Sequence, residues 1–204
     1  MDYKIGKLSV SRETFERLEL YADLLKKWNP KINIVSKTSL DDLWGRHIVD
    51  SAQMFSLLPP SARLWVDMGS GGGFPGLVVA VLARELAPEL RVTLIESDQR
   101  KCAFLRTVSR ETEGVAKVLT GRIEEIEPLN ADVVSARALA DLSKLLEFGA
   151  YHRAEAGICL FPKGLTWEKE VQAARDSWRF SLEVITSETQ ENAVILKINE
   201  IDNA

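Results

Sequence analysis

Apolar residues recur at helical spacing in the first part of the chain. Five of them fall on one side of a helix expected over 12–28, with charged residues between them. They are Phe15, Leu18, Ala22, Leu25 and Trp28. Asn29 and Pro30 predict the end of this helix, because the residue before a proline disfavours helical angles.

A second helical pattern covers 40–57 and ends before Pro59 and Pro60. Ser39 and Asp42 have the spacing of a capping box, in which side chains satisfy the free N–H groups of a first helical turn. The two helices together predict an N-terminal helical extension over residues 1–60.

From about residue 61 the pattern changes to short apolar runs separated by helical stretches. Continuous rather than alternating apolar strands indicate a sheet buried on both faces. Repeated strand–helix units predict an α/β domain over 61–204 with a Rossmann-like fold, a mostly parallel seven-stranded sheet with helices on both faces. No helix separates the last two strands, so one of them is expected to run antiparallel. Strands are expected at 63–68, 91–96, 116–119, 131–135, 157–161, 180–186 and 193–199, and helices at 76–87, 98–112, 139–153 and 166–177.

A glycine-rich loop, Asp67-Met68-Gly69-Ser70-Gly71-Gly72-Gly73-Phe74-Pro75-Gly76, follows the first strand of this domain. Residues 71–76 fit the G-x-G-x-x-G dinucleotide fingerprint. Residues 67–73 fit acidic-x-G-x-G-x-G, which resembles motif I of class I methyltransferases. The acidic residue favours the second interpretation, because a carboxylate suits cationic S-adenosylmethionine and repels a pyrophosphate. We therefore expect S-adenosylmethionine as the cofactor, with contacts from Asp67, Gly69 and Gly71.

Further candidate contacts follow the next two strands. Glu96 is positioned to accept from ribose hydroxyls, although a solvated strand-end charge is the alternative. Asp98 either joins this contact or caps the next helix. At the third junction Ile123 is expected on the adenine ring and Glu124 at its amino group, although the acidic run that Glu124 opens is alternatively a solvated surface.

Two cations end neighbouring central strands, at the edge where ligands bind such sheets. Arg137 and Lys163 are our candidates for positioning the reacting groups, through the cofactor, a base edge or a phosphate. His47 lies on an apolar helix face, which favours a satisfied buried histidine over a catalytic one. Arg46 and Asp50 stand one helical turn apart and suit either an ion pair or, equally, the docking of the extension on the core.

Composition limits the remaining possibilities. The chain has 204 residues, a net charge of -4, two cysteines and two histidines. No Cys/His spacing fits a metal site, so none is expected. No apolar run has the length of a membrane helix, and the start, Met1 to Lys4, has no secretory pattern. We expect a cytoplasmic, monomeric protein whose acidic total does not by itself indicate a nucleic-acid partner.

Several separated motifs nevertheless resemble those of the RsmG (GidB) family of 16S rRNA methyltransferases. The resemblance covers roughly residues 15–170, and the chain from about 178 carries no signature of it. It implies methyl transfer to N7 of one guanine in a loop near the decoding centre, with Gly69, Phe74, Ile123-Glu124 and Arg137 as cofactor contacts. The matching stretches are Trp28 to Ser36 (W-N-x-x-x-N), Arg46 to Ser51 (R-H-x-x-D-S), Gly69 to Gly76 (G-S-G-G-G-x-P-G), Glu96 to Lys101 with Phe104-Leu105, Ser135 to Ala138, and Pro162 to Gly164.

The chemistry agrees with this resemblance. N7 of guanine has a free lone pair, so its methylation needs alignment rather than a general base. Two alternatives remain: a methyltransferase acting on a small molecule or protein, and an NAD-dependent or nucleotide-binding module. If RNA is the substrate, local cations have to offset the acidic total, and an assembled small ribosomal subunit would offer the extensive surface required. The candidates for RNA contact are Asn29, Lys31, Asn33, Lys37, Arg46 and Arg100, with Lys26 and Lys27; the two asparagines alternatively cap or turn the backbone.

Overall fold

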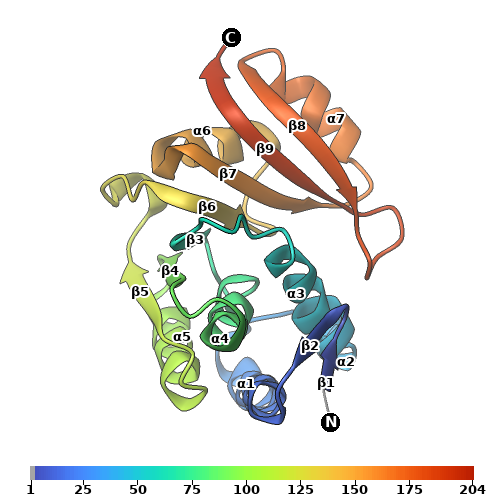
Figure 1. The fold of residues 1–204 in the computed structure, drawn as a ribbon, viewed down its shortest axis with the longest axis vertical. Coiled ribbons are helices and arrows are strands. Elements are labelled where there is room, and N and C mark those ends of the chain that lie inside the picture. The colour runs from blue at the N-terminus through green and yellow to red at the C-terminus, as the bar shows by residue number, and fades with distance from the viewer. Residues whose placement is uncertain (1–2) are drawn as a thin grey trace.

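A seven-stranded sheet runs through the molecule in the order β5-β4-β3-β6-β7-β9-β8 (Figure 1). The computed structural model describes residues 3–204, without the side chain of Lys37. From β5 to β7 neighbouring strands are parallel, while β9 is antiparallel to both β7 and β8. The predicted α/β sheet is confirmed, including one antiparallel strand among the last two. The strands are β3 Leu64–Met68, β4 Arg91–Glu96, β5 Ala116–Thr120, β6 Ala131–Ala136, β7 Arg153–Lys163, β8 Trp178–Thr186 and β9 Val194–Asn203.

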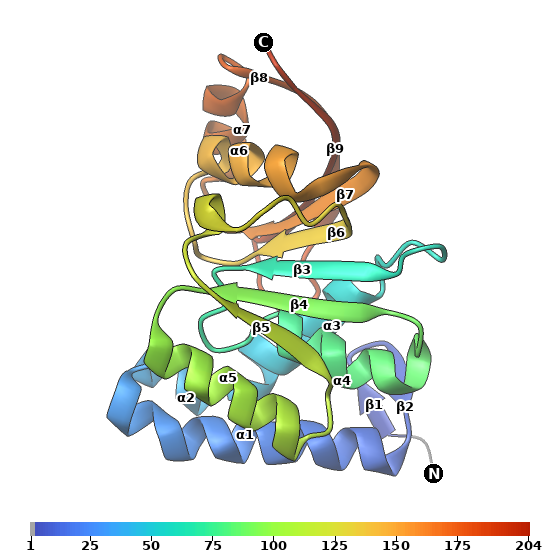
Figure 2. The same ribbon diagram turned by 90° about the vertical axis from the view of Figure 1, so that its left-hand side faces the viewer.

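Helices cover both faces of this sheet, as expected. On one face α4 (Gly76–Leu86) and α5 (Gln99–Glu111) lie against the strands, and α1 (Arg12–Ile32) runs beneath both of them (Figure 2). On the other face lie α6 (Leu142–His152) and α7 (Trp167–Ala174). Two buried apolar clusters, one per face, explain why the strands are apolar on both sides.

The order in which strands are added to the sheet reverses between β3 and β6, and this reversal positions the site. From β3 the chain builds outwards through β4 to β5, and it then returns to β6 on the opposite side of β3. The glycine loop follows β3, and Arg137 directly follows β6. In open α/β sheets such a reversal leaves a crevice at the carboxyl ends of the strands, where ligands bind.

The first helix is longer than predicted. Proline does not end it at Asn29: α1 continues through Pro30 to Ile32 and is capped by Asn33, whose φ is 49° and whose N–H bonds Asn29 O. A proline in the last turn removes one N–H donor, and the Asn29 side chain fixes the backbone that follows the helix. Its Oδ1 accepts from the N–H groups of Ile34 and Val35, at 2.7 and 2.8 Å.

The prediction of one helix over 40–57 is wrong. The chain forms α2 (Lys37–Asp41), a π-helical segment η1 (Trp44–Val49) and α3 (Asp50–Phe55). Ser36, not Ser39, caps the first piece, and Asp42 Oδ1 accepts from Gly45 N at 3.2 Å instead of completing a capping box. A side chain that captures a later N–H in this way competes with a continuous helix.

The N-terminal extension packs into the same core as the sheet. Leu18, Leu25 and Ile48 are fully buried in the apolar cluster that also holds Trp65 and Leu77. The boundary at residue 60 between the extension and the α/β domain therefore stays a prediction from the sequence. A hairpin of β1 (Tyr3–Ile5) and β2 (Leu8–Val10) also belongs to the extension; its strands are too short for sequence periodicity to reveal.

Candidate functional site

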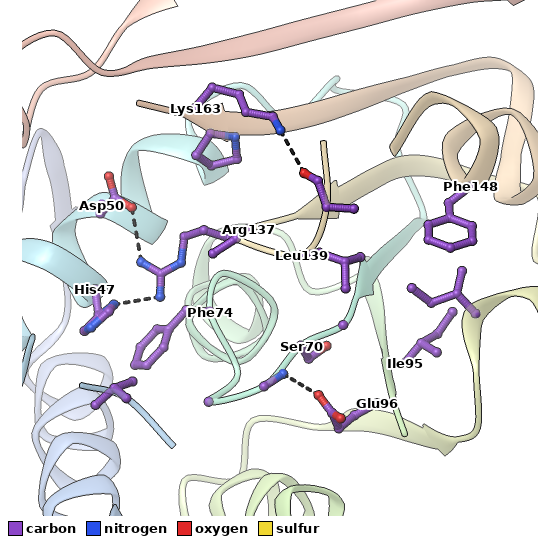
Figure 3. A pocket seen from close by; sticks show the side chains of 18 of the residues that line it. His47, Asp50, Ser70, Phe74, Ile95, Glu96, Arg137, Leu139, Phe148 and Lys163 are labelled. Atoms are coloured by element: carbon purple, nitrogen blue, oxygen red, sulfur yellow. Dashed lines mark hydrogen bonds and ion pairs between the residues drawn. The ribbon is translucent and has the colours of Figure 1, made fainter. Parts of the chain in front are cut away.

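A cavity of about 1070 Å³ opens at the carboxyl ends of the central strands, large for the roughly 300–1000 Å³ of a typical ligand pocket (Figure 3). It is built by the loops that follow the strands and by parts of both ends of the chain. The lining residues include 34–36, His47, Asp50, 69–72, Phe74, 95–97, 121–124, 137–140, 162–164, Ser187, Gln190 and 193–195. The site predicted from separate motifs is thus one continuous space.

The glycine loop forms the floor of this cavity. Gly69 has φ 61°, which strains any residue with a side chain, and a Cβ there would lie 2.5 Å from Leu139 Cδ1 and force that side chain to move. The extension supports the loop from below, because the buried Tyr21 hydroxyl donates to Gly72 O. Ile34 also approaches Gly72, so the region before residue 60 helps to shape this floor.

Glu96 lies at the edge of this loop, as expected. Its Oε2 accepts from Gly71 N at 2.8 Å, its Oε1 accepts from Asp98 N at 2.8 Å, and the side chain faces the cavity. Asp98 has the alternative role: it caps α5 by accepting from Arg100 N and Lys101 N and is not among the lining residues. The Arg100 side chain and these backbone bonds hold the pKa of Asp98 at about 2.

Asp67 does not reach the cavity, contrary to the expected cofactor contact. It is fully buried beneath the loop, where Oδ1 accepts from Ser135 Oγ at 2.7 Å and Oδ2 accepts from Gly76 N at 3.2 Å. Burial raises its pKa to about 6, against the opposing hydrogen bonds. The carboxyl at this motif position fixes the start of α4, where a free helix N–H needs a partner.

Asp67→Asn is therefore expected to gain about 1–2 kcal/mol of stability relative to the wild type between pH 5 and pH 8, because only the wild type has to bury a charge as the pH rises. An acid whose pKa rises on folding, here from 3.8 to about 6, contributes most stability below the lower value and loses it as the pH rises through the higher one. Thermal unfolding at pH 5 and pH 8 measures this, and the advantage of the variant shrinks at pH 5. An equal difference at both pH values contradicts the prediction.

Apolar side chains line the side of the cavity next to Glu96. Figure 3 places Ile95, Leu139 and Phe148 there, and Ile123 lines the same cavity. Ile123 stands in the short 3-10 helix η2 (Ile123–Glu125), with Glu124 exposed beside it. Phe148 and Leu139 were not predicted, because helix spacing alone does not tell a ligand-facing apolar residue from a core residue.

Arg137 is held by three groups of the extension. Its Nη1 donates to Arg46 O at 3.1 Å and lies 3.4 Å from Asp50 Oδ2, and its Nη2 is 2.6 Å from His47 Nδ1 (Figure 3). Its guanidinium also lies 5.1 Å from the ring centre of Phe74. Arg46 and Asp50 do not pair with each other. They have the alternative role of docking the extension on the core, through Asp50 and Arg46 O at Arg137, and the Arg46 side chain is exposed.

His47 is buried, as expected, but only one of its two ring nitrogens has a hydrogen-bond partner among the described residues. A guanidinium only donates, so Nδ1 accepts from Arg137 and the ring proton resides on Nε2. Nε2 has no partner among the described residues, and the ring stacks on Phe74 with centres 4.7 Å apart. Burial, followed by the charges of Arg137 and Arg46, lowers the pKa of His47 to about 3.

Lys163 faces the same cavity with its charge already paired. Its Nζ lies 2.6 Å from Glu170 Oε2 and donates to Ala140 O at 2.9 Å. Glu170 Oε2 also accepts from Leu142 N. Lys163 thereby fixes the segment that leads from Arg137 into α6.

None of the residues expected to contact RNA is among the described residues that line the cavity. Asn29 is buried and turns the backbone, which is its alternative role, while Lys31, Asn33 and Arg46 are exposed. Arg100 pairs with Asp98 at 3.1 Å, Lys26 lies 3.6 Å from Asp23, Lys27 is exposed, and the side chain of Lys37 lies outside the described structure. The cations that do line the cavity are Lys101, Arg122 and Lys144, besides Arg137 and Lys163.

Across residues 3–204, no group of three His, Cys, Asp or Glu side chains comes together to hold a metal ion. None of the described helices has the length and apolar character needed to cross a membrane.

Comparison with known proteins identifies the family. A model of the family described as rRNA small subunit methyltransferase G matches residues 14–195. A protein of Ruegeria pomeroyi described as ribosomal RNA small subunit methyltransferase G is 55% identical over 194 residues, which are 95% of this chain and 95% of that protein. A protein of Rhodospirillum centenum with the same description is 54% identical over 192 residues, covering 94% of this chain and 87% of its own length.

Solved structures show the same fold at low sequence identity. The mitomycin 7-O-methyltransferase has a TM-score of 0.62 at 15% identity, over 93% of this chain and 68% of that one. The O-methyltransferase from Bacillus cereus has a TM-score of 0.57 at 13% identity, over 95% and 93%. The class I methyltransferase fold is therefore confirmed, and by its sequence the chain is a member of the rRNA small subunit methyltransferase G family.

Proposed function

We propose that this methyltransferase transfers a methyl group from S-adenosylmethionine to N7 of one guanine in 16S rRNA, in a decoding-region loop of the small ribosomal subunit. The observation that carries the proposal is the composition of the cavity. It joins a nucleoside-type half, with the glycine loop and Glu96, to a second half with Arg137 and Lys163. Membership of the family supplies the rRNA substrate.

The residues of the first half fit S-adenosylmethionine, whose sulfonium supplies an electrophilic methyl group. Gly69 and Gly71 present bare backbone to the cavity, and Glu96 has lone pairs left for two ribose hydroxyls after accepting from two N–H groups. Ile95, Ile123 and Phe148 offer apolar surface to the adenine, and Glu124 is an acceptor for its amino group. Phe74 and Arg137 border the opposite end of the loop.

The second half suits an acceptor that needs no deprotonation. Its ionisable groups are already engaged: His47 accepts from Arg137, Asp50 pairs with Arg137, and Lys163 pairs with Glu170. The lone pair of N7 forms the bond to the methyl carbon, the S–CH₃ bond breaks with its electron pair left on sulfur, and no proton moves. Alignment by Arg137 and Lys163 is the contribution expected of these side chains.

We further propose that the chain acts in the cytoplasm as a monomer on an assembled or nearly assembled small subunit. With a net charge of -4, its contact with RNA depends on local cations. Lys101, Arg122 and Lys144 at the cavity, with the exposed Lys31 and Arg46 nearby in the extension, supply them. Burying a specific base in the cavity requires it to leave its stack, which costs a few kcal/mol.

The test is transfer of a radiolabelled methyl group to small subunits that lack the modification, with naked 16S rRNA in parallel. We expect one labelled N7-methylguanine and faster labelling of subunits than of naked RNA. Binding of S-adenosylmethionine without RNA labelling points instead to a small-molecule or protein acceptor. Labelling of a different atom refutes the N7 assignment, and equal rates on both substrates refute the subunit requirement.

A further inference from the structure

The half of the cavity away from Glu96 is walled by three distant parts of the chain. The extension contributes His47 and Asp50, the end of β6 contributes Arg137, and the loop between β8 and β9 contributes Ser187 and Gln190. We call these five residues the acceptor side. The family model extends to residue 195 and includes this loop, but none of the sequence motifs lies in it, so its place at the site is visible only in the structure.

One buried carboxylate connects the three parts. Asp50 is 7% exposed; its Oδ2 lies 3.4 Å from Arg137 Nη1, and its Oδ1 accepts from Thr189 Oγ1 at 2.8 Å. Gln53 reinforces the junction, because its Nε2 donates to Asp50 Oδ1 and its Oε1 accepts from Glu188 N, both at 2.8 Å. The loop is thus fastened to the element that also holds Arg137.

The loop itself is preformed around the cavity. Ser187 N donates to Ala193 O at 2.9 Å and closes the turn, and Ser187 Oγ accepts from Gln190 N at 3.3 Å. Gln190 is exposed, lines the cavity, and its side-chain amide has no protein partner within residues 3–204. A free amide offers both a donor and an acceptor, which matches the donors and acceptors on a guanine edge.

The charges on this side also suit the reaction. Methylation at N7 leaves a positive charge on the purine, so an unpaired cation beside it would oppose transfer. Asp50 pairs the charge of Arg137, and the histidine that contacts Arg137 can only accept through Nδ1. The acceptor side therefore holds a guanidinium for alignment without an uncompensated charge.

We propose that the β8–β9 loop forms part of the acceptor side. The Thr189 hydroxyl holds the loop to Asp50, and Gln190 contacts the methyl-accepting purine. This inference rests on the proposed function and deepens it. Thr189 and Asp50 are positioning residues in this account, and Gln190 is a substrate contact.

The experiment compares Thr189→Val and Gln190→Ala with Thr186→Val, a matched control in the same hairpin whose hydroxyl is exposed and makes no hydrogen bond within the described chain. KM and kcat on small subunits are measured together with calorimetric affinity for S-adenosylmethionine. Loss of one hydrogen bond predicts a rise in KM of about 5- to 10-fold for Thr189→Val and Gln190→Ala. Cofactor affinity is expected to stay within about twofold of the wild type, and Thr186→Val to match the wild type throughout.

Unchanged KM in both loop variants overturns the proposal, and so does a loss of cofactor affinity as large as the rise in KM. Gln190 is exposed, so its variant keeps the test valid even if Thr189→Val unfolds. If the wild type labels a different atom of the RNA, the N7 assignment fails while the ratio of KM values still decides the role of the loop. If the wild type labels no RNA, both proposals fail.

Discussion

Gly69→Asp is expected to weaken S-adenosylmethionine binding by about 100-fold or more and to abolish methyl transfer. The backbone at Gly69 has φ 61°, which strains any residue with a side chain, and the new Cβ would meet Leu139 at 2.5 Å. Either the loop or Leu139 has to move, and both border the same cavity. Isothermal calorimetry of the purified variant measures the loss directly.

Gly164→Asp is the matched control for this variant. Gly164 lines the same cavity, yet a Cβ there meets nothing within 4 Å, so the same charge is added without strain. We expect its cofactor affinity to remain within about threefold of the wild type. Equal losses in the two variants would assign the effect to charge and contradict the role of loop geometry.

Arg137→Ala is expected to lower methyl transfer about 100-fold and to cost about 2–4 kcal/mol of stability. The change removes the hydrogen-bond partner of His47 and the cationic partner of Asp50, and it takes the guanidinium away from the ring of Phe74. Arg137→Lys should recover only part of the activity, because an ammonium group cannot reproduce three directed contacts. Initial rates on small subunits and thermal unfolding test the two effects separately.

The same variant has a spectroscopic signature. Arg137 is one cause of the lowered pKa of His47, about 3 in the intact site, so its removal is expected to raise that pKa towards the ordinary value of 6.5. The chain has two histidines, which makes their ring proton signals simple to follow by NMR during a pH titration. A His47 signal that still fails to titrate above pH 4 would show that burial alone keeps the ring neutral.

The central sheet was predictable because each of its strands is visible as a pattern in one short stretch of sequence. Each strand is an apolar run, and the order of strands and helices limits the topology to few choices. The glycine loop and Glu96 were predictable for the same reason, since their positions at strand ends define the edge at which they meet. The missing helix between β8 and β9 was enough to predict an antiparallel strand.

Other features depended on contacts between distant residues, which spacing does not encode. The break in the second helix arises because Asp42 bonds Gly45, a choice that a helical pattern does not reveal. The motif position of Asp67 suggested a cofactor contact, whereas Ser135 and Gly76 keep its carboxyl beneath the loop. Likewise, only the folded chain shows that Arg137 pairs with Asp50 and that the C-terminal loop reaches the cavity.

The place of β9 in the sheet has a consequence for synthesis on the ribosome. β9 follows β8 in the chain but lies between β7 and β8 in the sheet, so β8 has no neighbour to bond until residues 194–203 have been translated. β9 begins at Val194, which pairs with Lys163 and lines the cavity. The loop on the acceptor side is therefore anchored at both ends only after β9 has paired. A nascent chain therefore completes the acceptor side of its cavity only after β9 has been made, whereas the glycine loop follows β3 and Glu96 ends β4, two strands that precede β9 in the chain.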